Sequence, residues 1–155
     1  MTGKIEARLA ELGITLPEPA APAANYVPWV LSGNMVYVSG QLPIVDGKPG
    51  FLGRLGDDLD IAQGVEAARI CGLNIIAQLR AALEGDLDRV VRCVKLGGFV
   101  QCAPTFTQQP SVINGASDLM VEVFGDAGRH ARYAVGTVSL PLGVAVEVEA
   151  IFEVV

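Results

Sequence analysis

The sequence predicts a single-domain α+β protein in which a mixed β-sheet carries two helices on one face. Residues 57–83 place apolar side chains at helical spacing, and residues 144–155 alternate between apolar and polar side chains. Turn and helix signals elsewhere give the order strand–strand–helix–strand–helix–strand–strand. A length of 155 residues suits one domain with a substantial core.

Residues 1–24 are expected to precede the main domain, which spans residues 25–155. Thr2 is a suitable N-cap for a short helix that ends near Leu12, and the Pro- and Ala-rich residues 16–24 predict an extended arm. Charges run through the first helix, so it does not resemble a signal peptide. No apolar run approaches the ~20 residues of a membrane span. We therefore expect no membrane partner and a cytoplasmic location.

The first two strands are expected near residues 27–31 and 35–39, because Ser32-Gly33-Asn34 between them has tight-turn chemistry. Residues 41–56 contain several glycines and are expected to form a loop, with room for a small hairpin.

The longest helix is expected to begin near Asp57 or Asp58, since either side chain can serve as an N-cap, and to run to about Leu83, with Gly85 as the stop signal. The next strand should cover residues 89–102, with Gly97-Gly98 as a candidate β-bulge.

A second helix is expected from Pro110, which suits a first helical turn, to about Gly125. Two strands then flank the turn at residues 140–143, and Arg132 stands where the first of them begins.

The last strand has an apolar face and an acidic face, and Glu147, Glu149 and Glu153 lie on the acidic one. A nearby guanidinium such as that of Arg132 can bind a small carboxylate ligand through two parallel hydrogen bonds. The alternative is an edge strand with solvated glutamates and a salt-bridging arginine. The residues alone leave both interpretations open.

The composition argues against a nucleic-acid partner and for self-association. The net charge is −6, and the 11 Lys and Arg residues are scattered rather than clustered. Only 18% of residues are charged, and two helices on one face leave the other face of the sheet uncovered. A symmetric oligomer is the simplest cover for that face.

The sequence lacks the usual signals for metals, phosphates and nucleophilic catalysis. Cys71, Cys93 and Cys102 form no CxxC pair, which predicts reduced, buried thiols. His130 is the single histidine, and no serine or cysteine stands in a nucleophile-elbow context. We therefore expect neither a metal nor a cofactor, and a loop or surface role for His130.

Four segments resemble the RidA/YjgF family of small imine deaminases, some members of which are labelled endoribonucleases. They are Asn25-Tyr26-Val27, residues 33–43 (GNMVYVSGQLP), Ala131-Arg132 and residues 146–151 (VEVEAI), and residues 112–119 are similar to a longer-chained subgroup. The resemblance implies a chorismate-mutase-like fold and a homotrimer with a ligand cleft between subunits. It also implies cofactor-free hydrolysis of enamine and imine acids, such as 2-aminoacrylate, to 2-oxo acids and ammonia.

Site roles follow from the same resemblance. Arg132 matches the arginine that holds the ligand carboxylate, and Glu147 matches the acidic residue near the reacting carbon, where it would act on water. The cleft-lining positions are Tyr26, Ser39, Gly40, Asn114 and, through its backbone N–H, Ala134.

Three residues depart from the family pattern. Tyr133 replaces a small residue, Ala134 a cysteine and His130 a proline, so we expect a reshaped cleft. Besides a deaminase, the same cleft would suit a non-catalytic binder of small carboxylates, and the endoribonuclease label gives a third reading.

Overall fold

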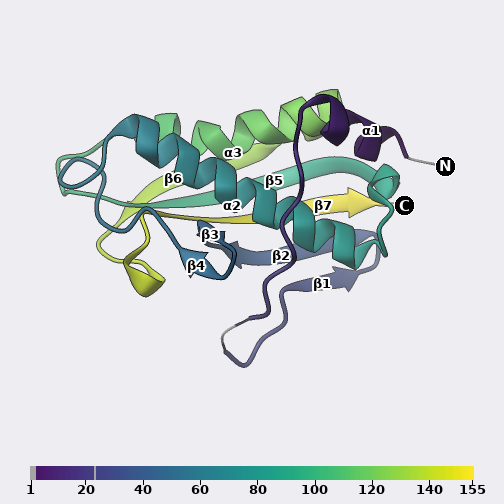
Figure 1. Cartoon of the computed structure of the whole chain (residues 1–155), viewed down its shortest axis with the longest axis horizontal. Helices are drawn as coiled ribbons and strands as arrows, with labels where there is room; N and C mark the ends of the chain where they lie inside the picture. Colours follow the sequence, from purple (N-terminus) through teal and green to yellow (C-terminus); the bar gives the residue numbers. More distant parts are fainter. Residues whose placement is uncertain (1–2, 23) are drawn as a thin grey trace.

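A five-stranded sheet forms the centre of the computed structural model, which describes residues 3–22 and 24–155 (Figure 1). Its strands lie in the order β1 (Trp29–Ser32), β2 (Met35–Gln41), β7 (Val146–Val154), β5 (Val90–Gln101) and β6 (Ala131–Thr137). The pair β5–β6 is parallel and the other neighbours are antiparallel. This mixed sheet confirms the predicted α+β class.

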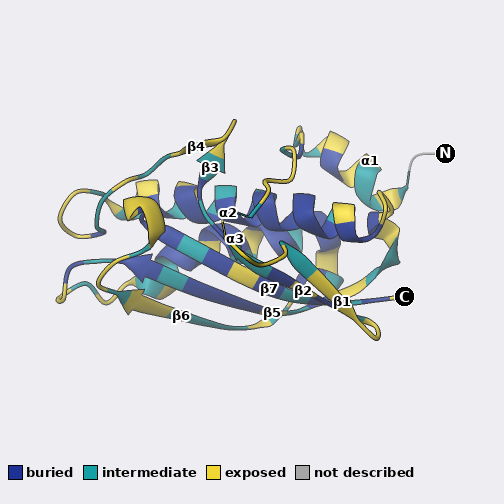
Figure 2. Cartoon of the chain, turned by 90° about the horizontal axis from the view of Figure 1, so that it is seen from below, coloured by how far each residue is buried: buried dark blue, intermediate teal, exposed yellow. Residues whose placement is uncertain are grey.

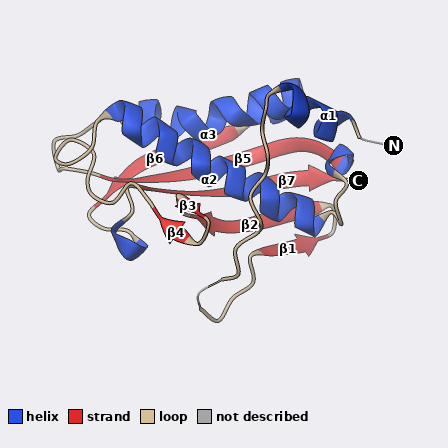
Figure 3. Cartoon of the chain, in the orientation of Figure 1, coloured by secondary structure: helices blue, strands red, loops and turns tan. Residues whose placement is uncertain are grey.

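Two long helices, α2 (Ile61–Ala82) and α3 (Gln109–Phe124), cover one face of the sheet (Figure 3), as predicted. The alternation in β7 explains why: Val146, Val148, Ala150, Phe152 and Val154 are buried under these helices. The alternative of a solvated edge strand is wrong for β7, which lies in the centre, while β1 and β6 are the edges. Figure 2 shows much of the sheet's exposed surface on those two edge strands.

Helix α2 begins at Ile61, so the predicted N-caps at Asp57 and Asp58 are wrong. Asp60 caps the helix instead, accepting from the Gln63 backbone N–H at 2.8 Å while the Gln63 side chain accepts from the Asp60 N–H at 2.9 Å. This reciprocal capping box satisfies two helix-end donors at once. The Asp58 carboxylate accepts from the Arg54 N–H at 2.9 Å within the preceding turn.

The expected bulge at Gly97-Gly98 is also wrong, because β5 keeps its register with β7 there and shifts near Val90–Arg92 and Cys93–Lys95 instead. The two glycines serve close packing. A Cβ on Gly97 would collide with the ring of Tyr133, and one on Gly98 would lie 2.6 Å from Ile113 of α3.

Helices α2 and α3 touch closely at Gly115. A Cβ on this residue would collide with the backbone carbonyl oxygen of Val65, which cannot move without displacing α2.

Gly115→Ala should therefore lower the free energy of unfolding by about 1–3 kcal/mol, the usual cost of overpacking. In an open helix the same change stabilises, so the sign of the effect is diagnostic. Urea unfolding measures it, with the exposed Asp118→Ala on the same helix as the control. Equal stability of the parent and Gly115→Ala would contradict the close approach.

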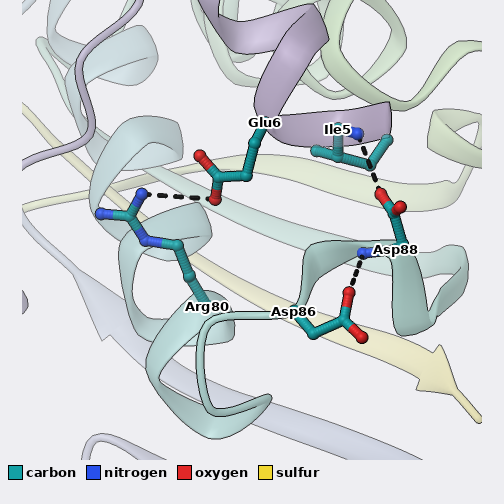
Figure 4. A network of polar contacts seen from close by, with 5 residues as sticks. All are labelled: Ile5, Glu6, Arg80, Asp86 and Asp88. Carbon is teal, nitrogen blue, oxygen red and sulfur yellow. Dashed lines mark hydrogen bonds and ion pairs between the residues drawn. The ribbon is translucent and has the colours of Figure 1, made fainter. Parts of the chain in front are cut away.

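The N-terminal helix α1 (Lys4–Glu11) is held by a distant carboxylate (Figure 4). Asp88, in the 3₁₀ turn Leu87–Arg89, accepts from the backbone N–H groups of Lys4 and Ile5 at 2.9 Å each. These hydrogen bonds lower the pKa of Asp88. An ion pair from Arg80 to Glu6 at 3.4 Å ties the helix to α2. The predicted cap Thr2 lies outside the described residues.

The remaining short elements surround the sheet. A two-stranded hairpin, β3 (Ile44–Val45) and β4 (Lys48–Pro49), occupies the predicted loop, and 3₁₀ turns lie at Gly125–Gly128 and Pro141–Gly143. No helix within the described residues is long and apolar enough to cross a membrane.

Candidate functional site

Arg132 lies at the start of the edge strand β6, where its partly buried side chain faces α3. Its Nη1 donates to Asn114 Oδ1 at 2.8 Å and to Ser117 Oγ at 2.9 Å, and its Nη2 donates to the Pro110 carbonyl at 3.1 Å. Asn114 and Ser117 are three residues apart on α3, so both face the same side of the helix. The first turns of α3 thereby fix the plane of the guanidinium.

Two N–H groups of Arg132 remain available to a ligand. A guanidinium has five N–H donors, and the described residues accept three of them through neutral oxygens. The Nε–H and one Nη2–H have no acceptor among those residues. None of the ion pairs within the described chain includes Arg132, so no carboxylate neutralises its charge. The salt-bridging alternative is therefore wrong for Arg132 within one chain.

His130 and Ser117 extend this network. The His130 Nε2 lies 2.8 Å from Ser117 Oγ, and its Nδ1 lies 2.6 Å from the Gly128 carbonyl oxygen. Because a carbonyl only accepts, Nδ1 must carry the proton of a neutral ring, which leaves Nε2 to accept from the Ser117 hydroxyl. His130 lies in the loop before β6, as expected, and its partly buried ring also takes part in the Arg132 network.

A cavity lies further along β6, and Arg132 is not among the residues that line it. Ala134 and Gly136 share the helix-facing side of β6 with Arg132, and Gly136 lines a cavity of about 310 Å³ together with Arg54, Cys102 and Gln109. A Cβ on Gly136 would lie 2.9 Å from both Cys102 Sγ and Gln109 Nε2, so a side chain there would fill the space.

Glu147, the predicted acidic residue, lies on β7 against Gly40 of β2. A Cβ on Gly40 would approach the Glu147 carboxylate to 3.0 Å, so the absence of a side chain lets the two segments meet. Burial, and secondly the like charge of Glu149, raise the pKa of Glu147. A carboxylate of raised pKa is better suited to exchange protons near neutral pH.

Tyr26 and Ser39 lie close to this second group. Tyr26 and Gly40 line a common cavity of about 110 Å³, whose other walls include Pro28 and Leu142. The Ser39 hydroxyl donates to the Val27 carbonyl at 2.8 Å, which holds the segment before β1 against β2.

Tyr133 points to the face of the sheet opposite to Arg132. Its ring covers Gly97, packs edge-on against Phe99 with the ring centroids 5.6 Å apart, and its hydroxyl donates to Glu149 Oε1 at 2.8 Å. Burial, with Glu149 as the second cause, raises the pKa of Tyr133 to about 12. The change from a small residue therefore alters the surroundings of Glu147 and Glu149, while the Arg132 side chain lies on the other face of the sheet.

The predicted site residues accordingly fall into two groups. Arg132 pairs in register with Leu96, which is buried under the helices, whereas Glu147 pairs with Phe99, three positions further along β5. Paired residues share a face of the sheet and residues three apart lie on opposite faces. A small ligand on Arg132 in one chain therefore cannot contact Glu147 of that same chain.

Two of the three cysteines are poorly suited to chemistry, whereas Cys102, which was expected to be buried, is only partly buried and lines the cavity at Gly136. Cys71 and Cys93 are buried, and burial raises the pKa of Cys93 to about 12 and that of Cys71 well above its ordinary value. Across residues 3–22 and 24–155, no three His, Cys, Asp or Glu side chains gather in an arrangement for holding a metal ion.

Glu147→Gln should stabilise the fold relative to the parent as the pH rises. The raised pKa means that the native state binds its proton more tightly than the unfolded chain does, so ionisation on going to neutral pH costs stability. The amide removes this cost. Urea midpoints between about pH 4 and 8, at matched protein concentration, should diverge with increasing pH. A constant difference would contradict the unfavourable environment of this carboxylate.

A family model, a protein of similar sequence and solved structures of the same fold all match this chain. A model of the family described as "YjgF/chorismate_mutase-like, putative endoribonuclease" matches residues 6–153. Protein TCP17 of Trypanosoma cruzi is 54% identical over 153 residues, which cover 98% of this chain and 95% of that protein.

Solved structures extend the comparison. The protein Atu1372 of unknown function from Agrobacterium tumefaciens superposes with a TM-score of 0.91 and 52% identity, covering 97% of this chain and 92% of that one. A putative endoribonuclease from Shewanella oneidensis superposes with a TM-score of 0.94 and 37% identity, covering 98% of this chain and 100% of that one. The YjgF gene product of E. coli superposes with a TM-score of 0.62 and 27% identity, covering 90% of this chain and 97% of that one.

The fold and these similarities define a chorismate-mutase-like α+β protein. The chain belongs to the YjgF/RidA family, as its sequence motifs predicted.

Proposed function

We propose that this protein hydrolyses reactive enamine and imine acids of the 2-aminoacrylate type to 2-oxo acids and ammonia, at a cleft between copies of the chain in a homotrimer. A small imino- or 2-oxo-carboxylate is the proposed ligand, without metal or cofactor. A cytoplasmic location is part of the proposal and is supported by the free cysteines.

The observation that supports it best is the state of Arg132. Three neutral acceptors fix the guanidinium, its charge has no carboxylate partner in the described chain, and two N–H donors remain. A planar carboxylate requires this combination of charge and two parallel donors. Orienting the acid through its carboxylate presents the C=N carbon to an attacking water.

The reaction then needs one water and proton transfers only. The oxygen of water adds to the C=N carbon, Glu147 accepts a proton from that water, and the nitrogen is protonated. The resulting carbinolamine loses ammonia as its C–N bond breaks, which leaves the C=O group of a 2-oxo acid. The raised pKa of Glu147 makes it a stronger proton acceptor than an ordinary carboxylate.

The two groups of residues would be completed by a second copy. Arg132, Asn114 and Ser117 lie at the free edge of β6, whereas Glu147, Gly40 and Tyr26 lie towards the open face. That face carries exposed apolar side chains, including Tyr37 and Val135, which suit burial against another chain. In the proposed trimer the β6 edge of one copy would lie beside the Glu147 group of the next, so that the two groups line one cleft.

Light scattering should return a stable trimer at micromolar concentration. The uncovered sheet face and the divided site both require neighbours. A monomer would contradict the composite cleft, and a dimer would reject the trimeric arrangement while leaving the fold unchanged.

The direct test of function is hydrolysis of imino acids generated in the assay by an amino-acid oxidase. The parent should accelerate release of the 2-oxo acid above the spontaneous rate, and Arg132→Ala should not. If the parent binds 2-oxobutanoate by calorimetry but accelerates nothing, the non-catalytic binding function is correct instead.

An endoribonuclease activity, as in the family description and the label of the Shewanella relative, is disfavoured by the net charge of −6, which opposes binding of a polyanion. RNA cleavage by purified protein that disappears in Arg132→Ala would favour the endoribonuclease activity over the proposed imine hydrolysis.

A further inference from the structure

We infer that Ser117 and His130 are positioning residues for Arg132: they orient the guanidinium so that its Nε–H and one Nη2–H are presented to the ligand carboxylate. This inference rests on the proposed carboxylate-binding role of Arg132. Neither residue was among the candidate site residues of the sequence.

The hydrogen bonds form a directed chain. Arg132 Nη1 donates to Ser117 Oγ at 2.9 Å, the Ser117 hydroxyl donates to His130 Nε2 across 2.8 Å, and His130 Nδ1 donates to the Gly128 carbonyl across 2.6 Å. Every donor has one acceptor, and such chains strengthen their members by mutual polarisation. The hydroxyl proton is held away from Arg132, so a lone pair of Ser117 faces the guanidinium.

The Gly128 end of this series of hydrogen bonds packs closely against α3. A Cβ on Gly128 would collide with the Met120 carbonyl of α3, so the Gly125–Gly128 turn lies directly on the helix that carries Ser117. The acceptor for His130 is thereby fixed relative to Ser117. His130 also lies two residues before Arg132, which places the two side chains on the same side of the segment.

The hydrogen bond to Ser117 determines which N–H donors of the guanidinium remain available to a ligand. With Asn114 holding one Nη1 hydrogen and Ser117 the other, Nη1 has none left for a ligand. The remaining donors are on Nε and Nη2, neighbouring nitrogens able to hold both oxygens of a carboxylate. Without Ser117, the guanidinium gains freedom to rotate about its bond to Asn114.

His130 decides where the Ser117 hydroxyl points. A serine within a helix readily donates to the carbonyl four residues earlier, here that of Ile113. Loss of the His130 acceptor would permit this bond and turn the lone pairs away from Arg132. The role of His130 is thus indirect, and it does not require the ring to touch the ligand.

The test is binding of 2-oxobutanoate by calorimetry to the full-length protein. Ser117→Ala and His130→Leu should each weaken the affinity about tenfold, the usual effect of one lost hydrogen bond, and raise KM for the imino acid more than they lower kcat. Ser117→Thr keeps the hydroxyl, and His130→Gln supplies a side-chain oxygen that can accept in place of Nε2, so each should recover most of the loss. Ser111→Ala, on the same helix but outside the network, is the matched control.

A double-mutant cycle tests whether the effect of Ser117 on binding acts through Arg132. In an Arg132→Ala background, Ser117→Ala should have no further effect on the residual affinity, because its effect acts through the guanidinium. Parent-like binding by folded Ser117→Ala and His130→Leu, or an equal effect with and without Arg132, would overturn the inference.

A second measurement does not depend on the proposed function. In the ligand-free parent, NMR should show Arg132 Nη1 protons that rotate and exchange slowly, and in Ser117→Ala these signals should average. Signals in Ser117→Ala that are unchanged from those of the parent would overturn the positioning role. This holds even if 2-oxobutanoate binds neither parent nor variant, a result that would refute the proposed function alone.

Discussion

Arg132→Ala should weaken 2-oxobutanoate binding about a hundredfold and reduce imino-acid hydrolysis to the spontaneous rate, while the fold is kept. The size follows from losing a charge-assisted contact made through two hydrogen bonds. The fold should survive because Arg132 lies at an edge strand, partly exposed, and its partners Asn114 and Ser117 retain access to water.

Arg132→Lys should weaken binding and hydrolysis almost as much, because one ammonium group cannot replace the two parallel N–H donors of the guanidinium. The lysine ammonium group has only three N–H donors, so the ligand would compete for them with the oxygens of Pro110, Asn114 and Ser117. Arg129→Ala is the matched control, since Arg129 is highly exposed and pairs with Asp126 at 3.7 Å outside the site. Parent-like binding and turnover by Arg132→Ala would place the site elsewhere on the molecule.

Glu147→Gln should preserve 2-oxobutanoate binding and lower kcat on the order of a hundredfold, within the usual contribution of a general base. The amide keeps the size of the side chain beside Gly40 and removes only its ability to accept a proton. Single-turnover kinetics with an imino acid measure the rate apart from binding.

Glu153→Gln, on the same strand and face but outside the Glu147 group, is the control for removing a negative charge. A kcat for Glu147→Gln equal to that of this control would exclude Glu147 as the group that acts on water.

The parts of the fold with a strong periodic signal were predictable from the sequence. The alternation of residues 146–154 and the helical spacing of residues 61–82 gave β7 and α2, because burial on one face sets both patterns. The helix start was less predictable, since Asp57, Asp58 and Asp60 all suit an N-cap. The capping box with Gln63 was the signal that distinguishes Asp60.

The glycine pair of β5 was misinterpreted for a different reason. Gly97 and Gly98 are needed by Tyr133 and Ile113, which approach from other elements. A sequence does not show such long-range contacts, so the sequence alone predicts a local feature, the bulge.

The site was only partly predictable. Motifs predict Arg132 and Glu147 as site residues, but their positions on opposite faces follow from the register of β5 with both neighbours. Ser117 had a weak signal, since it lies one helical turn after Asn114, and His130 lies two residues before Arg132. Neither spacing reveals that the two side chains meet, because α3 and β6 are brought together only by the fold.

The central claim, a catalytic site divided between neighbouring copies, is tested most directly by mixing two inactive variants. Arg132→Ala and Glu147→Gln chains are co-expressed with different tags, and oligomers that contain both are purified. In any mixed trimer one cleft combines an intact Arg132 with an intact Glu147, so about one third of the parental activity should return. Mixed oligomers no more active than the separate variants would contradict the composite site.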